Sequence, residues 1–278
     1  MTSQRQSLRR RLERVRQALR GDALRTEAPH ASGGSSTVDA RTLDVDEVLH
    51  PAEVTADHFA PGFAGFVAAA GVSGARLASA ESARLGGDSD ALYFDLETTG
   101  LGLRARIFLT GCLCWEGGGL RLQQEFATDL AQEREVLSRL RERMVRRPRL
   151  ITYNGRSFDV PLLRRRLAFH SLEPLPPELV VEDLLHRTRR AHGKGLPNCR
   201  LSTVERLLIG KLREGKDICG AEAPLRFQDF LATGRRELLD PIVYHNRIDL
   251  TTLVALRWLL DRDAEDKSPT QDSLGMDS

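Results

Sequence analysis

Asp95 and Glu97, two acidic residues two positions apart in the segment FDLETTGL, form the most informative pattern in the sequence. The apolar residues before them and the Thr-Thr-Gly after them predict a buried strand that runs into a loop, so both side chains would project from one face. Two close carboxylates repel each other unless a cation neutralises them or one takes up a proton. A hard divalent ion with oxygen ligands is the natural neutraliser, so the pair is a candidate metal site, although acidic pairs also occur by chance at exposed strand ends.

Two further acids stand in contexts that suit the same site. Asp159, in YNGRSFDVPLL, follows a predicted strand and loop at the start of a predicted helix, where an isolated Asp could also be only a capping or first-turn residue. Asp249, in HNRIDLTTLVAL, lies in the otherwise apolar last helix, and His245 precedes it by one helical turn on the same face. An ordinary pair on a helix surface would have the same spacing, so these positions alone leave both interpretations open.

In this order, the segments FDLETTGL, YNGRSFDVPLL and HNRIDLTTLVAL resemble the three exonuclease motifs of the DEDD superfamily of nucleases. A closer resemblance is to the bacterial YprB-type ribonuclease H-like proteins. It is supported also by IFLTG after the first motif and by VEDLLHRTRRAHGKGLPNCRLSTVERLLIG between the second and the third, and it covers about residues 91–262.

The resemblance implies hydrolysis of phosphodiester bonds in DNA or RNA, usually from the 3′ end, with two Mg²⁺ or Mn²⁺ ions as cofactors. Asp95 would bridge the two ions. The other positions that match the acidic ligands of the family are Glu97, Asp159 and Asp249.

His245 falls where the resemblance implies a general base, which is a histidine or a tyrosine in different branches of the family. The histidine branch places this base five residues before the last Asp, whereas His245 stands four residues before Asp249, which is the spacing of the tyrosine branch. Tyr244 occupies the five-residue position, but on a regular helix it would point well away from Asp249. We therefore favour His245 and leave the subclass open.

Polar and basic side chains around these motifs are candidates to bind a nucleic acid, because its backbone is polyanionic. The basic residues crowd two segments, although arginine-rich helix faces are often merely solvated. The first segment contains Arg141, Arg143, Arg146, Arg147, Arg149, Arg156, Arg164, Arg165 and Arg166, and the second, in a predicted loop-like region, contains Arg187, Arg189, Arg190, His192 and Lys194. The residues that we select as nucleic-acid contacts are Thr98, Asn154, Arg156, Ser157, Arg164 and Arg165.

The elements that must position these residues alternate in type along the chain. Three strands are predicted first, in ALYFDLETTG, IFLTGCLCWE and LRLQQEFATD, with the glycine cluster at 117–119 forming a hairpin turn between the last two. Next come a helix at 133–146, a strand in RPRLITYNG, a helix in FDVPLLRRRLAFH capped by Ser157, a strand in ELVVEDLL, and helices in LSTVERLLIG, FQDFLATG and PIVYHNRIDLTTLVALRWLLD. Together with the resemblance, this order predicts an α/β, ribonuclease H-like fold: a mixed five-stranded sheet, its first three strands antiparallel, flanked by helices.

The remaining segments differ in composition from this domain at 91–262. Residues 1–20 predict a basic amphipathic helix, which could contact nucleic acid or simply pack on the domain, and residues 21–90 predict a low-complexity, partly ordered linker. Residues 263–278 predict a disordered tail. Cys112 and Cys114 would share one strand face as small buried hydrophobic residues, and the spacing of the four cysteines does not favour a zinc site.

Composition indicates a globular protein, with 41% hydrophobic and 29% charged residues and a formal net charge of +2. The N-terminal sequence lacks the apolar segment of a secretory signal, and the chain has no apolar run near the ~20 residues of a membrane helix, so we expect a cytoplasmic protein that has no membrane partner. Two rival functions stay open: a catalytically weak nucleic-acid-binding module with the same fold, and a structure-specific endonuclease. Nothing in the sequence selects DNA or RNA.

Overall fold

A computed structural model of the protein describes residues 43–49, 90–116, 119–209, 213 and 217–265. The predicted N-terminal helix lies outside the described residues, as do most of the predicted linker and the segment 266–278.

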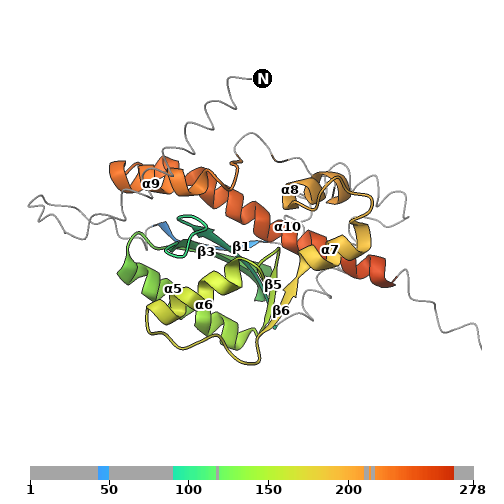
Figure 1. Ribbon diagram of the computed structural model, residues 1–278, viewed down its shortest axis with the longest axis horizontal. Coiled ribbons are helices and arrows are strands. Elements are labelled where there is room, and N and C mark those ends of the chain that lie inside the picture. Colours follow the sequence, from blue (N-terminus) through green and yellow to red (C-terminus); the bar gives the residue numbers. More distant parts are fainter. Residues whose placement is uncertain (1–42, 50–89, 117–118, 210–212, 214–216, 266–278) are drawn as a thin grey trace, which may run out of the picture. The chain divides into compact units, whose positions relative to one another are not determined.

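The described part of the chain is built on one mixed sheet of six strands, in the order β1-β4-β3-β2-β5-β6 (Figure 1). Strands β1 to β4 form antiparallel pairs, whereas β5 pairs with β2, and β6 with β5, in parallel. The bounds are Val45–Leu49 (β1), Ala91–Thr98 (β2), Ile107–Glu116 (β3), Gly119–Phe126 (β4), Arg149–Thr152 (β5) and Val180–Asp183 (β6). The predicted mixed sheet and the antiparallel order of its first three predicted strands are therefore confirmed.

The sheet has one strand more than predicted, because β1 adds to its edge from within the segment that we expected to be a linker. The sequence of this strand, VDEVL, does not alternate regularly between apolar and polar residues, and its structure depends on pairing with β4. The Asp44 carboxylate before it accepts a hydrogen bond from the Phe126 backbone N–H at 2.9 Å, and Asp46 forms an ion pair with Arg121 at 2.6 Å.

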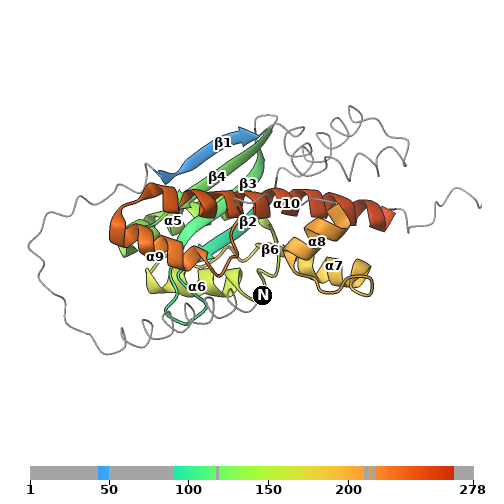
Figure 2. The ribbon, with the colours of Figure 1, turned by 90° about the horizontal axis from the view of Figure 1, so that it is seen from above.

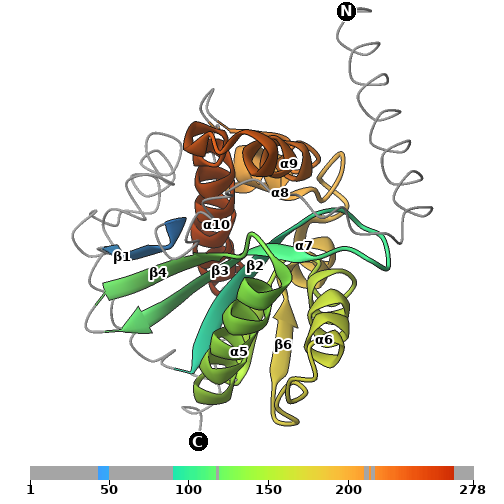
Figure 3. The same cartoon turned by 90° about the vertical axis from the view of Figure 1, so that its left-hand side faces the viewer.

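Helices cover both faces of the sheet (Figure 3). The helices α5 (Leu130–Arg146) and α6 (Asp159–Phe169) pack on one face, where the side chains of Leu92, Phe94 and Leu96 point. The long helix α10 (Asp240–Glu265) packs on the other face, against Ala91 and Tyr93, and crosses the strands (Figure 2). The shorter helices are α7 (Leu184–His192), α8 (Leu201–Val204), which continues as a π-helical turn at Glu205–Ile209, and α9 (Ala223–Thr233).

Three local expectations are wrong. Ser157 does not cap α6, since that helix follows Phe158 without a side-chain cap and the Ser157 N–H donates to the Asn154 carbonyl at 3.1 Å. The second basic cluster lies largely on the helix α7 rather than in a loop. Residues 263–265 belong to α10 and not to a tail, because the apolar face of that helix continues to Leu260 in the core.

Two other features of the described part bear on the predictions. Cys112 and Cys114 are buried in the same hydrophobic cluster, as the alternation of the strand predicted, and all four cysteines are free thiols. No helix among the described residues is both long and apolar enough to cross a membrane.

Candidate active site

The carboxylates of Asp95 and Glu97 stand on the face of the sheet that α10 covers. They continue the alternation of Ala91 and Tyr93, whose side chains pack against α10. Asp95 pairs with Gly111 of β3, and the register shifts in a bulge directly after Glu97. Glu97 is only 7% exposed, so the strand buries at least one of its two acids rather than presenting both to water.

Asp159 comes to the same region from the first turn of α6, directly after the loop that leaves β5. This loop contains Asn154, whose φ of 63° is in the left-handed region that Asn tolerates better than most residues. Asp183, the last residue of β6, holds the loop: its carboxylate accepts hydrogen bonds from the backbone N–H groups of Asn154 at 2.8 Å and Arg156 at 3.1 Å. It also caps α7 through the Leu185 N–H at 3.0 Å. No local sequence pattern indicated this buried acid, because its partners lie 27 and 29 residues away.

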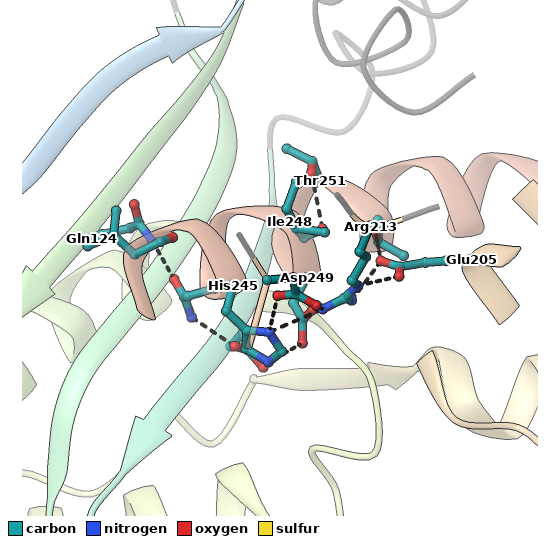
Figure 4. A network of polar contacts seen from close by, with 12 residues as sticks. Gln124, Glu205, Arg213, His245, Ile248, Asp249 and Thr251 are labelled. Atoms are coloured by element: carbon teal, nitrogen blue, oxygen red, sulfur yellow. Dashed lines mark hydrogen bonds and ion pairs between the residues drawn. The ribbon is translucent and has the colours of Figure 1, made fainter. Parts of the chain in front are cut away.

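His245 and Asp249 lie one turn apart on α10, as predicted, with His245 Nε2 at 3.8 Å from Asp249 Oδ2 (Figure 4). The other ring nitrogen, Nδ1, lies 2.7 Å from Oδ1 of Asp217. A carboxylate can only accept, so Nδ1 carries the proton and Nε2 faces Asp249. Asp217 was not among the predicted site residues.

Arg213 is a second residue that the sequence did not reveal. Its guanidinium donates two hydrogen bonds to Glu205, at 2.5 and 2.7 Å, and a third, at 2.5 Å, to Asp249. Its Nη1 also donates to Oδ2 of Asp217 at 3.3 Å. Glu205 is 1% exposed, so Arg213 is anchored from inside the protein and carries a fixed positive charge to the edge of the acidic group (Figure 4).

Asp95, Glu97 and Asp159 hold their protons more tightly than free carboxyl groups do. Desolvation, and then the charges of Asp249, Glu97 and Asp159, raise the pKa of Asp95 well above its usual range. Desolvation is also the main cause that raises the pKa of Glu97 to about 8 and that of Asp159 to about 7. Each pKa is raised further by neighbouring acids, so the predicted acidic residues are close enough to repel one another.

The pKa of His245 is raised, although burial by itself lowers the pKa of a histidine. Burial lowers its pKa, but the hydrogen bond to Asp217 and the charges of Asp249 and Glu97 outweigh this and raise the pKa to about 9. The imidazole is therefore held as a cation among these acids at neutral pH.

The chemistry of these residues fits a divalent ion, because carboxylate oxygens are the ligands that such an ion prefers. The raised pKa values show that the ionised carboxylates need more positive charge nearby, which the ion supplies. Within the described part of the chain, however, no three His, Cys, Asp or Glu side chains are placed together closely enough to hold a metal. Arg213 and His245 provide the cationic charge here instead.

The predicted nucleic-acid contacts differ in accessibility. The Thr98 hydroxyl donates to the Gly100 carbonyl at 2.9 Å, and the Arg156 guanidinium donates to the Val181 carbonyl. Asn154 is half-buried in its turn. The exposed members are Arg156, Ser157, Arg164 and Arg165.

Several arginines of the two basic segments have structural partners instead. Arg143 pairs with Glu125, and the buried Arg166 forms an ion pair with Glu133 at 2.5 Å. On α7, Arg187 pairs with Glu182 and with Asp261. The surface available to a polyanion is therefore smaller than the count of arginines indicated.

Comparison with known proteins is consistent with this fold and with these motifs. A model of the RNase_H superfamily matches residues 92–260, which include all four predicted metal-binding acids. The protein YprB of Bacillus subtilis (strain 168) is 31% identical over 188 residues, which cover 60% of this chain and 41% of that protein. The chain thus spans less than half the length of this relative. It belongs to the ribonuclease H superfamily, as a YprB-type ribonuclease H-like protein.

Proposed function

We propose that the protein is a metal-dependent nuclease that hydrolyses phosphodiester bonds of a nucleic acid, acting from the 3′ end. Membership of the ribonuclease H superfamily supports nuclease activity in general and a nucleic-acid substrate. The observation that carries the proposal is the gathering of Asp95, Asp159 and Asp249 from a strand and two helices into one region, where their charges raise the pKa of Asp95.

Asp95, Glu97, Asp159 and Asp249 would hold the divalent ions, Mg²⁺ or Mn²⁺. Two such ions supply an activated water and stabilise negative charge on the entering and leaving oxygens of the phosphate. The ions would also relieve the mutual repulsion of the acids, which lowers their pKa values and leaves them ionised at neutral pH.

The residues of the chain contribute proton transfer and binding. Asp217 holds the Nδ1 proton of His245, and the charges of Asp249 and Glu97 help to keep the ring protonated. Ions that neutralise these acids would lower the His245 pKa, and Nε2, once deprotonated, would accept a proton from water near Asp249. The exposed guanidinium groups of Arg164 and Arg165 lie on α6, whose first residue is Asp159, and would bind phosphates leading to the site.

A nuclease assay with Mg²⁺ and with Mn²⁺ tests the proposal, with wild type compared against Asp95→Ala on DNA and on RNA substrates. Cleavage by the wild type that is lost in the variant and in excess chelator is the expected result. Equal background in both proteins would reject catalysis and favour the binding module. The ion pair between Arg213 and Asp249 favours this alternative, because the guanidinium can neutralise Asp249 in place of a metal ion.

End-labelled and circular substrates separate the two nuclease types. We expect stepwise loss of mononucleotides from a 3′ end and no cleavage of a closed circle. Discrete internal fragments from the circle would identify an endonuclease instead.

A further inference from the structure

A buried amide contacts the first of the four acids. Asn246 of α10 is fully buried, and its Nδ2 donates to Oδ2 of Asp95 at 2.8 Å. Its Oδ1 accepts from Nε2 of Gln124, which is also fully buried, at 2.9 Å. The two amides therefore form a hydrogen-bonded chain from β4 to the Asp95 carboxylate, and one end of it, at Gln124, is labelled in Figure 4.

The direction of this chain is fixed by acceptors at both ends. Gln124 Nε2 also donates to the backbone carbonyl of Val243 at 3.0 Å. A carbonyl and a carboxylate only accept hydrogen bonds. Each amide can therefore form all of these bonds only with its nitrogen and oxygen placed one way round. Asn246 must therefore present N–H to Asp95, which engages one of the carboxylate's lone pairs and leaves others for a cation.

A glycine makes room for the amide. Asp95, Gly111 and Gln124 are direct cross-strand neighbours on β2, β3 and β4. A Cβ at Gly111 would lie 2.1 Å from Asn246 Oδ1 and 2.8 Å from its Cγ, so any larger residue would displace the amide. Glycine within a strand weakens the strand, and close approach of another group is one reason for it. Because Gly111 has no side chain, it leaves a gap in which the Asn246 amide lies beside Asp95.

We propose that Asn246 is a positioning residue that holds the Asp95 carboxylate in the orientation that binds a divalent cation, through the gap at Gly111. This inference rests on the proposed function, in which Asp95 is a metal ligand. Hydrogen-bonded partners of metal ligands typically contribute about 10- to 100-fold to metal affinity. We expect a contribution of that size here.

The test is Mn²⁺ affinity, measured by titration calorimetry on the full chain without nucleic acid, together with the unfolding temperature. Asn246→Leu keeps the number and branching of the side-chain heavy atoms but removes the donor, and it should weaken Mn²⁺ binding about 10- to 100-fold. Gly111→Ala changes no polar group, yet it should weaken binding in the same way because the methyl group displaces the amide. Where Asn246→Leu does not fold, the smaller Asn246→Ala, which also lacks a donor, carries the test.

Two controls separate positioning from general loosening of the fold. Gly195→Ala, where the added Cβ meets nothing nearer than 3.7 Å, should bind Mn²⁺ as the wild type does. Phe227→Leu loosens a buried aromatic stack in another cluster, so it should lower the unfolding temperature and leave the affinity unchanged.

Affinities of the Asn246 and Gly111 variants within about twofold of wild type would overturn the inference, and so would an equal loss in Phe227→Leu. Failure of the wild type to bind Mn²⁺ would overturn the proposed function together with this inference. If an Asn246 variant binds Mn²⁺ as the wild type does, while Asp95→Ala abolishes nuclease activity, the positioning role of Asn246 is overturned and the proposed function stands.

Discussion

Nδ1 of His245 lies 2.7 Å from Oδ1 of Asp217, a residue 28 positions earlier in the chain. Asp217 is in turn 3.3 Å from the guanidinium of Arg213. The imidazole is therefore held by a carboxylate that has its own counter-charge, and the pKa of Asp217 is lowered: burial opposes the shift, but the hydrogen bond to His245 and the charge of Arg213 outweigh it. This arrangement fixes the orientation of the ring and keeps a proton on Nδ1.

Replacing Asp217 tests this relationship. In Asp217→Asn the hydrogen bond loses its charge, the ring orientation loosens, and we expect kcat to fall about 100-fold, within the range that a general base contributes. The hydrogen bond to Asp217 is the first of the causes that raise the His245 pKa, so this pKa should fall and the acidic limb of the rate profile should move to lower pH. Asp217→Glu should restore part of the rate. An unchanged kcat and pH profile would show that Asp217 has no part in positioning the base.

The metal-free protein should become less stable as the pH rises. Folding raises the pKa of Glu97 from 4.5 to about 8, that of Asp159 from 3.8 to about 7 and that of His245 from 6.5 to about 9. In each case the folded state binds the proton more tightly, so the stability present below the unfolded pKa is lost as the pH rises through the folded pKa. We expect the unfolding temperature in chelator to fall between pH 5 and pH 9.

Added Mg²⁺ should reduce this fall, since the ion neutralises the same acids. Glu97→Gln should make the chelator curve less steep between about pH 5 and pH 8, because the amide does not titrate. A curve that rises with pH in chelator, or that Glu97→Gln leaves unaltered, would contradict the assigned pKa shifts.

Exposed arginines on α6 should control nucleic-acid binding more than chemistry. Arg164→Ala and Arg165→Ala should each weaken binding and lower the dependence of log affinity on log salt concentration by about 1 per residue that contacts a phosphate. Fluorescence anisotropy between 50 and 200 mM salt, with a labelled single strand, measures both quantities. Salt slopes equal to that of the wild type would exclude α6 from the phosphate path.

The buried pair between Glu133 and Arg166 should matter for stability. Glu133 also accepts a hydrogen bond from the Ile107 backbone N–H at 2.8 Å, so it ties α5 and α6 to the start of β3. Glu133→Ala would leave a buried guanidinium without its counter-charge and should destabilise the fold by about 3–5 kcal/mol in urea unfolding. Glu135→Ala on the same helix removes a half-exposed pair with Arg139 and should cost less than about 1 kcal/mol. Equal effects of the two variants would contradict this assignment.

Local patterns were sufficient for most elements of the fold. The alternation in ALYFDLETTG placed Asp95 and Glu97 on one face of β2, and the 3.6-residue period identified α5, whose buried residues include Val136, Leu137 and Leu140. These features depend on residues within one strand or one helix. The extra strand β1 and the missing cap at Ser157 were not predictable, because both depend on partners from other elements or on the loop geometry.

The sequence by itself determined the four acids and the spacing of His245 and Asp249, since strand and helix periodicity fix which side chains share a face. The order of its elements, with the family resemblance, also determined the mixed sheet. Only the tertiary structure decided what surrounds these groups. Asn246 reaches Asp95 across 151 residues, and Arg213 reaches Asp249 across 36. No local pattern encodes such contacts: they arise when the sheet and α10 pack together, and burial then requires each charged or amide group to find a partner.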